Sequence, residues 1–173
     1  MDRPALRGAT IVFTTAVGVL LLDRLTKAWA ERSLTDAPVD LIDGVLTLRF
    51  TTNTGGAFSL LPDAPWFFAA ASIVACLVIA VMAFRPRPRL HAVAFGLILA
   101  GALGNLLDRA LRAPGMRGDV VDFIDLHVWP VFNVADVAIV AGVLLLASGA
   151  LRSEHHDGSA GAAPGEREAG RHA

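Results

Sequence analysis

The chain has 173 residues, of which 54% are hydrophobic and 18% are charged, and its mean hydropathy is +0.56. Soluble domains carry about 25% charged residues, so a water-soluble fold of this size would leave too much apolar surface exposed. The net charge of -1 excludes the strongly basic surface that nucleic-acid binding requires. The single cysteine, Cys76, excludes an internal disulfide and a cysteine-rich zinc site. We therefore expect a membrane protein with no nucleic-acid partner, no metal and no cofactor.

Four apolar segments approach the length needed to cross a bilayer, which is about 20 residues. The predicted fold class is therefore an all-α polytopic membrane protein with four transmembrane helices. The predicted boundaries are spans at about 9–30, 66–84, 90–108 and 131–151, outer loops at about 31–64 and 109–130, a membrane domain over 1–151, and a tail over 152–173. The tail is rich in Gly, Ala, Glu and Arg without an apolar period, so it is expected to be disordered.

Basic residues indicate the orientation of these spans. Three arginines stand within residues 85–89, in the short loop between the second and third spans. Short cytoplasmic loops carry an excess of Lys and Arg. Arg3, Arg7 and Arg152 fall on the same side as this loop when four spans are counted. We therefore place both termini in the cytoplasm and the two larger loops outside.

The first outer loop contains a hairpin signal. Asp43-Gly44 stands between two β-prone runs, at 39–42 and 45–50. An Asp-Gly pair in this position favours a tight turn between antiparallel strands. We expect a small extracytoplasmic β-hairpin or sheet on the outer membrane face.

Polar residues at membrane depth are costly and tend to be functional. They gather here at the outer ends of three spans: Asp23 with Lys27, Asn105 with Asp108 and Arg109, and Asn133 with Asp136. The spacings of three and four residues place the members of each cluster on one helix face. For the clusters around Asp23 and Asp108, an interfacial ion pair or a helix cap explains the pattern as well as a functional site does.

Asp136 lies about a turn inside an apolar helix, so it requires a partner. The nearest acidic candidate is Asp122, whose apolar neighbours on both sides would raise its pKa. Two adjacent carboxylates near a low-dielectric boundary share one proton. Such a pair can activate a water molecule and polarise a carbonyl, which is peptide hydrolysis without a covalent intermediate. Asp119 and Asp125 are expected to be solvated loop charges.

The alternative function is a proton-coupled membrane carrier or channel, with Asp23, Asp108 and Asp136 as acidic relay residues. Such a relay requires acids distributed through the membrane depth, whereas these acids gather at one face. The motifs Gly-x-Ser-x-Gly and His-Glu-x-x-His of other hydrolases are absent from the sequence. The pattern therefore favours an aspartyl peptidase over a carrier.

Five short motifs follow one another along the chain: Asp23-Arg24-Leu25-Thr26-Lys27, Asn53-Thr54-Gly55-Gly56-Ala57-Phe58-Ser59, Gly104-Asn105-Leu106-Leu107-Asp108-Arg109, Val120-Val121-Asp122-Phe123-Ile124 and Phe132-Asn133-Val134-Ala135-Asp136. Together, and in this order, they resemble the motifs of the bacterial lipoprotein signal peptidases, also called signal peptidase II. The resemblance covers about residues 9–151. The stretch 111–119, between the third and fourth motifs, is long for the family's pattern but does not include any motif residue.

The resemblance implies an aspartyl endopeptidase of the bacterial inner membrane, with its site at the outer face. It implies that Asp122 and Asp136 are the catalytic pair. The residues that would support the pair or hold substrate are Asn53, Asn105, Arg109, Asn133, Asp23 and Lys27. The implied partners are prolipoprotein signal peptides that carry a diacylglyceryl-modified cysteine, membrane lipids, and cyclic peptide inhibitors of the globomycin type.

Overall fold

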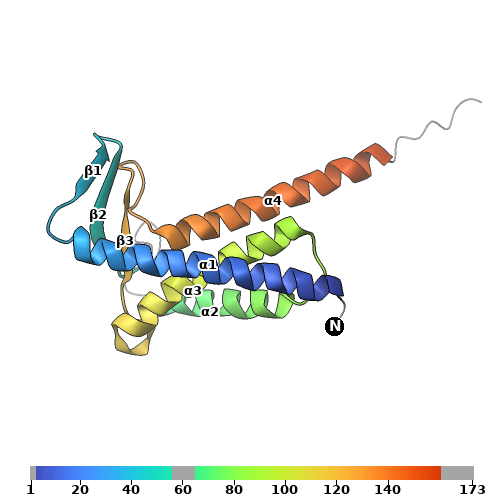
Figure 1. Ribbon diagram of the computed structural model, residues 1–173, viewed down its shortest axis with the longest axis horizontal. Coiled ribbons are helices and arrows are strands. Elements are labelled where there is room, and N and C mark those ends of the chain that lie inside the picture. The colour runs from blue at the N-terminus through green and yellow to red at the C-terminus, as the bar shows by residue number, and fades with distance from the viewer. Residues whose placement is uncertain (1–2, 56–64, 161–173) are drawn as a thin grey trace, which may run out of the picture.

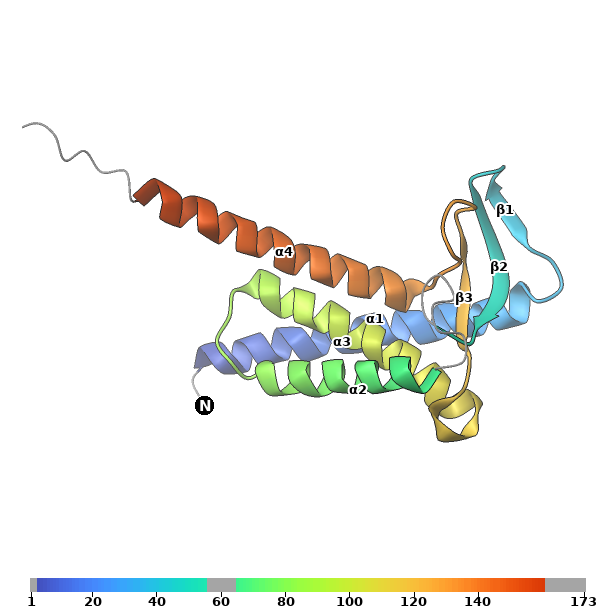
Figure 2. The same ribbon diagram turned by 180° about the vertical axis from the view of Figure 1, so that it is seen from behind.

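We describe the chain from a computed structural model, over residues 3–55 and 65–160. The elements are α1 (Arg3–Ser33), β1 (Val39–Ile42), β2 (Leu46–Asn53), α2 (Pro65–Met82), α3 (Arg89–Arg112), the short 3-10 helix η2 (Pro114–Met116), β3 (Val120–Asp125) and α4 (Val134–Ala160). The helices run roughly along one direction and the sheet stands at one end of them (Figures 1 and 2). The N-terminus and the loop between α2 and α3 lie at the opposite end (Figures 1 and 2).

Each of the four predicted spans corresponds to a helix. Two of them, α1 and α3, are long and apolar enough to cross a membrane by themselves. The apolar stretches of α2 and α4 are shorter, at Trp66–Met82 and Val134–Gly149, so the number of spans stays a prediction. Many large aliphatic side chains on all four helices point outward, as a lipid-facing surface requires, including Leu21, Leu25, Val74, Leu77, Val81, Val140 and Leu144.

The helix α3 packs against α1, α2 and α4. Small residues allow this close approach. A Cβ atom added at Gly96 would lie 2.6 Å from Thr15 Cβ of α1, and one at Gly101 would lie 2.3 Å from the carbonyl oxygen of Ala135 in α4. Helices in membranes associate through such close van der Waals packing, since lipid tails are as apolar as the helix surfaces. The core between the helices is therefore built mainly of Ala and Gly.

The sheet confirms the predicted hairpin and extends it. The strands are antiparallel in the order β1-β2-β3. The turn between β1 and β2 contains Gly44 at φ 67°, a backbone conformation that glycine adopts without strain. The third strand was not predicted. Its side chains are buried along nearly the whole strand, so the sequence lacks the alternation of apolar and polar residues that marks a half-exposed strand.

The end of α4 differs from the predicted boundary. The helix continues to Ala160, so the predicted start of the tail, at residue 152, falls within it. The rest of that tail, at 161–173, lies outside the described residues. The predicted disorder of the tail stays a prediction.

Candidate active site

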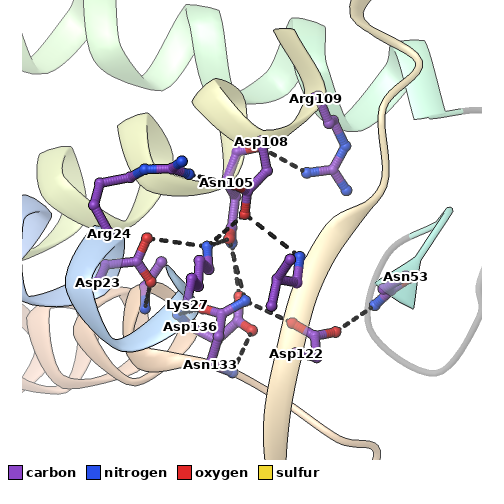
Figure 3. A network of polar contacts seen from close by, with 12 residues as sticks. Asp23, Arg24, Lys27, Asn53, Asn105, Asp108, Arg109, Asp122, Asn133 and Asp136 are labelled. Atoms are coloured by element: carbon purple, nitrogen blue, oxygen red, sulfur yellow. Dashed lines mark hydrogen bonds and ion pairs between the residues drawn. The ribbon is translucent and has the colours of Figure 1, made fainter. Parts of the chain in front are cut away.

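The predicted site residues meet where the sheet joins the ends of α1, α3 and α4 (Figure 3). They come from five elements: Asp23 and Lys27 from α1, Asn53 from β2, Asn105 and Arg109 from α3, Asp122 from β3, and Asn133 and Asp136 from the start of α4. A continuous set of hydrogen bonds and ion pairs connects them. All five motifs therefore contribute side chains to this network. The second motif contributes Asn53, and its residues 56–59 lie outside the described part of the chain.

Asp122 is 2% exposed, on the strand that pairs with β2. Its Oδ1 accepts a hydrogen bond of 2.6 Å from Asn133 Nδ2, and its Oδ2 accepts one of 3.1 Å from Asn53 Nδ2. The Asn53 amide is oriented in turn, because its Oδ1 accepts the backbone N–H of Gly55 at 3.0 Å. Both oxygens of Asp122 therefore face fixed donors.

Asp136 is held in the first turn of α4. Its Oδ2 accepts the backbone N–H of Asn133 at 3.2 Å, and the Asn133 Oδ1 accepts the backbone N–H of Asp136 at 3.0 Å. This reciprocal arrangement is a capping box, which satisfies two N–H groups at the helix start. The Asp136 Oδ1 accepts a further hydrogen bond of 2.8 Å from Asn105 Nδ2. The helix cap and the candidate catalytic group are thus the same side chain.

Asn133 is fully buried and bridges the two acids, since its amide donates to Asp122 while its backbone N–H donates to Asp136. Burial raises the pKa of Asp122 to about 7, and the negative charge of Asp136 adds to the increase. The hydrogen bonds from Asn53 and Asn133 act in the opposite direction. This carboxyl therefore keeps its proton to a much higher pH than an ordinary aspartate does.

Lys27 is fully buried behind the acidic pair. Its Nζ lies 3.0 Å from Asp23 Oδ2 and 2.8 Å from Asp108 Oδ2, and it donates a hydrogen bond of 3.0 Å to Asn105 Oδ1. An ammonium group can only donate, so Lys27 holds the oxygen of the Asn105 amide and turns its nitrogen toward Asp136. This buried charge therefore sets the orientation of a group that contacts the candidate acid.

A cavity of about 280 Å³ opens beside this network. Its polar lining includes Asn53, Asn105, Arg109 and Asp136, and its apolar wall includes Phe68. The Arg109 Nη2 donates to the Gly55 carbonyl at 2.8 Å, whereas the buried Nε has no hydrogen-bond partner among the described residues. The cavity is thus lined by one acid of the pair and by a guanidinium group.

The model of the family described as "Signal peptidase (SPase) II" matches residues 15–152 of this chain. The chain belongs to the signal peptidase II family. Proteins named lipoprotein signal peptidase are similar to it. They include those of Caldicellulosiruptor bescii (46% identical over 130 residues, 75% of this chain and 83% of the relative), Rhodococcus jostii (41% over 138 residues, 79% and 70%) and Mycolicibacterium smegmatis (40% over 162 residues, 92% and 69%).

Two solved structures of bacterial membrane enzymes share the architecture of this signal peptidase II chain. One is 27% identical with a TM-score of 0.73, covering 91% of this chain and 94% of the other. The second is 29% identical with a TM-score of 0.69, covering 81% and 92%. These likenesses support the prediction of a membrane protein. The family match also confirms the resemblance that the five motifs indicated.

Two residues of this signal peptidase II chain that the sequence analysis did not assign to the site complete the network. Asp108 is fully buried and pairs with Lys27 and with Arg24 of α1. Its immediate neighbour Arg109 instead contacts the Asn105 and Gly55 carbonyls, so the cluster at the end of α3 is not one local ion pair. The sequence contained a signal for both residues, because Arg24 and Asp108 stand inside the quoted motifs. That they pair with each other between α1 and α3 is seen only in the folded structure.

The expectation of a solvated Asp125 is wrong. Its carboxylate pairs with Arg49 at 2.5 Å and accepts the backbone N–H of His127 at 2.8 Å. The hydrogen bond from Arg49 lowers the pKa of Asp125. Asp125 thus joins β2 to the segment after β3. The acids of the carrier alternative, Asp23, Asp108 and Asp136, lie together in one network through Lys27 and Asn105 (Figure 3).

Proposed function

We propose that this member of the signal peptidase II family is an aspartyl endopeptidase that removes the signal peptide from prolipoproteins, with Asp122 and Asp136 as its catalytic pair. The observation that carries the proposal is the Asn133 bridge, which holds both carboxyls in one buried unit. The pKa of Asp122, raised to about 7, supports the same assignment, because a pair that retains one shared proton at neutral pH contains both an acid and a base.

The proposed reaction uses one water molecule. The ionised carboxylate accepts a proton from the water molecule while the water oxygen forms a bond to the scissile carbonyl carbon. The neutral carboxyl, assigned to Asp122, donates its proton to the carbonyl oxygen, which gives a tetrahedral diol. When the C–N bond breaks, the leaving nitrogen takes the proton from the former base, and a diol proton returns to the other carboxylate. The pair ends with one proton, as it began.

The supporting residues are assigned by their contacts. Asn53, Asn105 and Asn133 hold the carboxyls, and Lys27 orients Asn105. We assign Arg109 to the backbone of the bound substrate, because it lines the cavity and its Nη2 already donates to a backbone carbonyl, that of Gly55. We assign cyclic peptide inhibitors of the globomycin type to the same cavity, since they would compete for these groups.

An apolar groove supports a lipid-modified substrate. It has a volume of about 460 Å³, lies along α4 from Phe132 to Leu144, and includes Asp136 in its lining. A diacylglyceryl group on the substrate cysteine could place an acyl chain there while the adjacent peptide bond lies at the acids. Burying each CH2 group contributes about 0.8 kcal/mol, so the acyl chain would increase the affinity for the substrate and fix the position of its peptide bond at the acids. Cleavage of the unmodified prolipoprotein is therefore expected to be poor.

The location follows from the same proposal. We place the chain in the bacterial inner membrane with both termini in the cytoplasm, because the loop with three arginines lies at the end of the helices opposite the sheet (Figures 1 and 2). The strand β3 of that sheet contains Asp122. The site then faces outward, where the sheet covers it.

The test is cleavage of a lipid-modified prolipoprotein by the purified chain in detergent. Asp122→Asn and Asp136→Asn should each reduce turnover by at least about 10²–10⁴-fold, the usual contribution of general acid–base catalysis. The double variant should be little worse than either, because members of one catalytic unit are not additive. Asp119→Asn is the matched control and should keep most of the activity. Near-normal turnover by either single variant would refute the aspartyl mechanism.

A further inference from the structure

A second cavity, mostly apolar but with basic residues in its lining, lies beside the loop between α2 and α3. This loop is at the end of the helices opposite the sheet (Figures 1 and 2). The volume of the cavity is about 610 Å³. Arg85, Arg87 and His91 contribute to its lining from the loop and the first turns of α3, and Phe95 and Leu146 contribute apolar walls. Neither the proposed peptidase reaction nor the family motifs use any of these residues.

The cavity carries positive charge without a matching acid. Among the described residues, its lining includes no Asp or Glu. The Nη1 atom of Arg87 is buried and has no hydrogen-bond partner within the described part of the chain. A buried guanidinium N–H without an acceptor is costly, and burial together with the neighbouring charge of Arg85 lowers the pKa of Arg87. These observations favour an anion as the ligand of this cavity.

The unpartnered guanidinium is held in place. The Arg87 Nε donates to the carbonyl of Arg85 at 3.2 Å, and the guanidinium carbon lies 4.3 Å from the centre of the Phe95 ring. Pro86 and Pro88 restrict the backbone on either side of it. Little conformational entropy remains to be lost when a ligand binds to this group.

The start of α3 adds to the attraction for an anion. Pro88 is the N-cap residue, its side chain makes no capping hydrogen bond, and the first turn contains no acidic residue. Pro88 and His91 both line the cavity. The N-terminal end of a helix carries partial positive charge and free N–H groups, which favour anions such as phosphate.

We propose that this cavity binds the phosphate-bearing headgroup of an anionic phospholipid. The arginines and the helix start would hold the phosphate, and the apolar walls of Phe95, Leu146 and Met82 would hold the first part of an acyl chain. These walls favour a lipid over free phosphate. Basic pockets between membrane helices are a known form of anionic-lipid site.

The experiment measures lipid binding to the purified full chain by native mass spectrometry in mild detergent. The probes are phosphatidylglycerol, phosphatidylcholine and inorganic phosphate. The wild type should retain phosphatidylglycerol in preference to phosphatidylcholine, and Arg87→Gln should weaken this retention about tenfold, as expected for one lost charge-assisted hydrogen bond. Arg89→Gln removes the same charge from an exposed residue that does not line the cavity, so it should change binding less than about threefold.

Three results would overturn the proposal. Equal retention of the two phospholipids would remove the charge selectivity, and displacement of phosphatidylglycerol by millimolar phosphate would indicate a free-anion site. Equal losses for Arg87→Gln and Arg89→Gln would indicate general electrostatic attraction. If Arg87→Gln does not fold, Arg85→Gln takes its place, with a loss of at least about threefold expected. Cleavage activity in lipid-free detergent should be unchanged in these variants, so failure here leaves the peptidase proposal untouched.

Discussion

Replacing Lys27 with methionine tests whether a buried charge organises the site. Lys27 is fully buried, and its Nζ has three partners: Asp23 Oδ2, Asp108 Oδ2 and Asn105 Oδ1. Methionine occupies a similar volume but cannot donate a hydrogen bond. Removing one member of a buried ion pair costs about 3–5 kcal/mol, because the other charge stays buried without compensation.

The remaining contacts decide where in this range the cost falls. Asp108 keeps its ion pair with Arg24, so it is partly compensated. Asp23 keeps only the backbone N–H of Ala135 on its Oδ1, at 3.0 Å, and its Oδ2 would have no cation. The substitution therefore leaves one carboxylate without compensation rather than two. The expected loss in the free energy of unfolding is near the lower limit of the range, at about 3 kcal/mol.

The assay is thermal or denaturant unfolding of the purified Lys27→Met chain in detergent, together with cleavage of a lipid-modified substrate. Arg49→Met is the control, because that arginine is 46% exposed in its ion pair with Asp125 and should cost less than about 1 kcal/mol. Adding Asp23→Asn to Lys27→Met should recover part of the stability but not the activity, since Asn105 Oδ1 then keeps only the longer hydrogen bond of 3.3 Å from Asn133 Nδ2. A loss below about 1 kcal/mol for Lys27→Met would refute this account.

Three further predictions concern other parts of the molecule. The pKa of Asp122 is raised on folding from 3.8 to about 7. Between these two pH values the folded state binds a proton that the unfolded state has lost, so the free energy of unfolding should fall as pH rises from about 4 to 7. Unfolding measured over this pH range should lose the decrease in Asp122→Asn. Gly104→Ala should destabilise the chain in a thermal melt, because its Cβ would lie 2.6 Å from Asp23 Oδ2, whereas Gly18→Ala, with nothing within 4 Å, should be neutral or slightly stabilising. Reporter fusions at Pro88 and in the β1–β2 turn should lie on opposite sides of the membrane, and a common side would contradict the proposed orientation.

The sequence predicted the helices and the acidic pair because both leave local signals. Long apolar runs mark the helices. Asp136 stands out because it is an acid inside such a run, and Asp122 because it is flanked by apolar residues. The hairpin was predicted for the same reason, since Asp43-Gly44 is a short-range signal.

Long-range contacts were not predictable in this way. The strand β3 is recognised only by its pairing with β2, where Asp122 lies opposite Thr51. The partners of Asp108 likewise depend on α1 lying beside α3. Neither pairing has a periodic signature, and both are fixed by how the elements pack.

The hydrogen-bond network also explains why the pKa of the buried Asp122 is raised only to about 7. Each oxygen of the pair accepts one described hydrogen bond: Asp122 from Asn133 and Asn53, and Asp136 from Asn105 and the Asn133 backbone. Burial raises the pKa of Asp122, and the hydrogen bonds from Asn53 and Asn133 lower it. The amide donors carry no charge, so they offset only part of the burial penalty. Because each carboxylate oxygen has a second lone pair, positions remain for the single proton of the proposed catalytic pair and for the water molecule that the ionised carboxylate would activate.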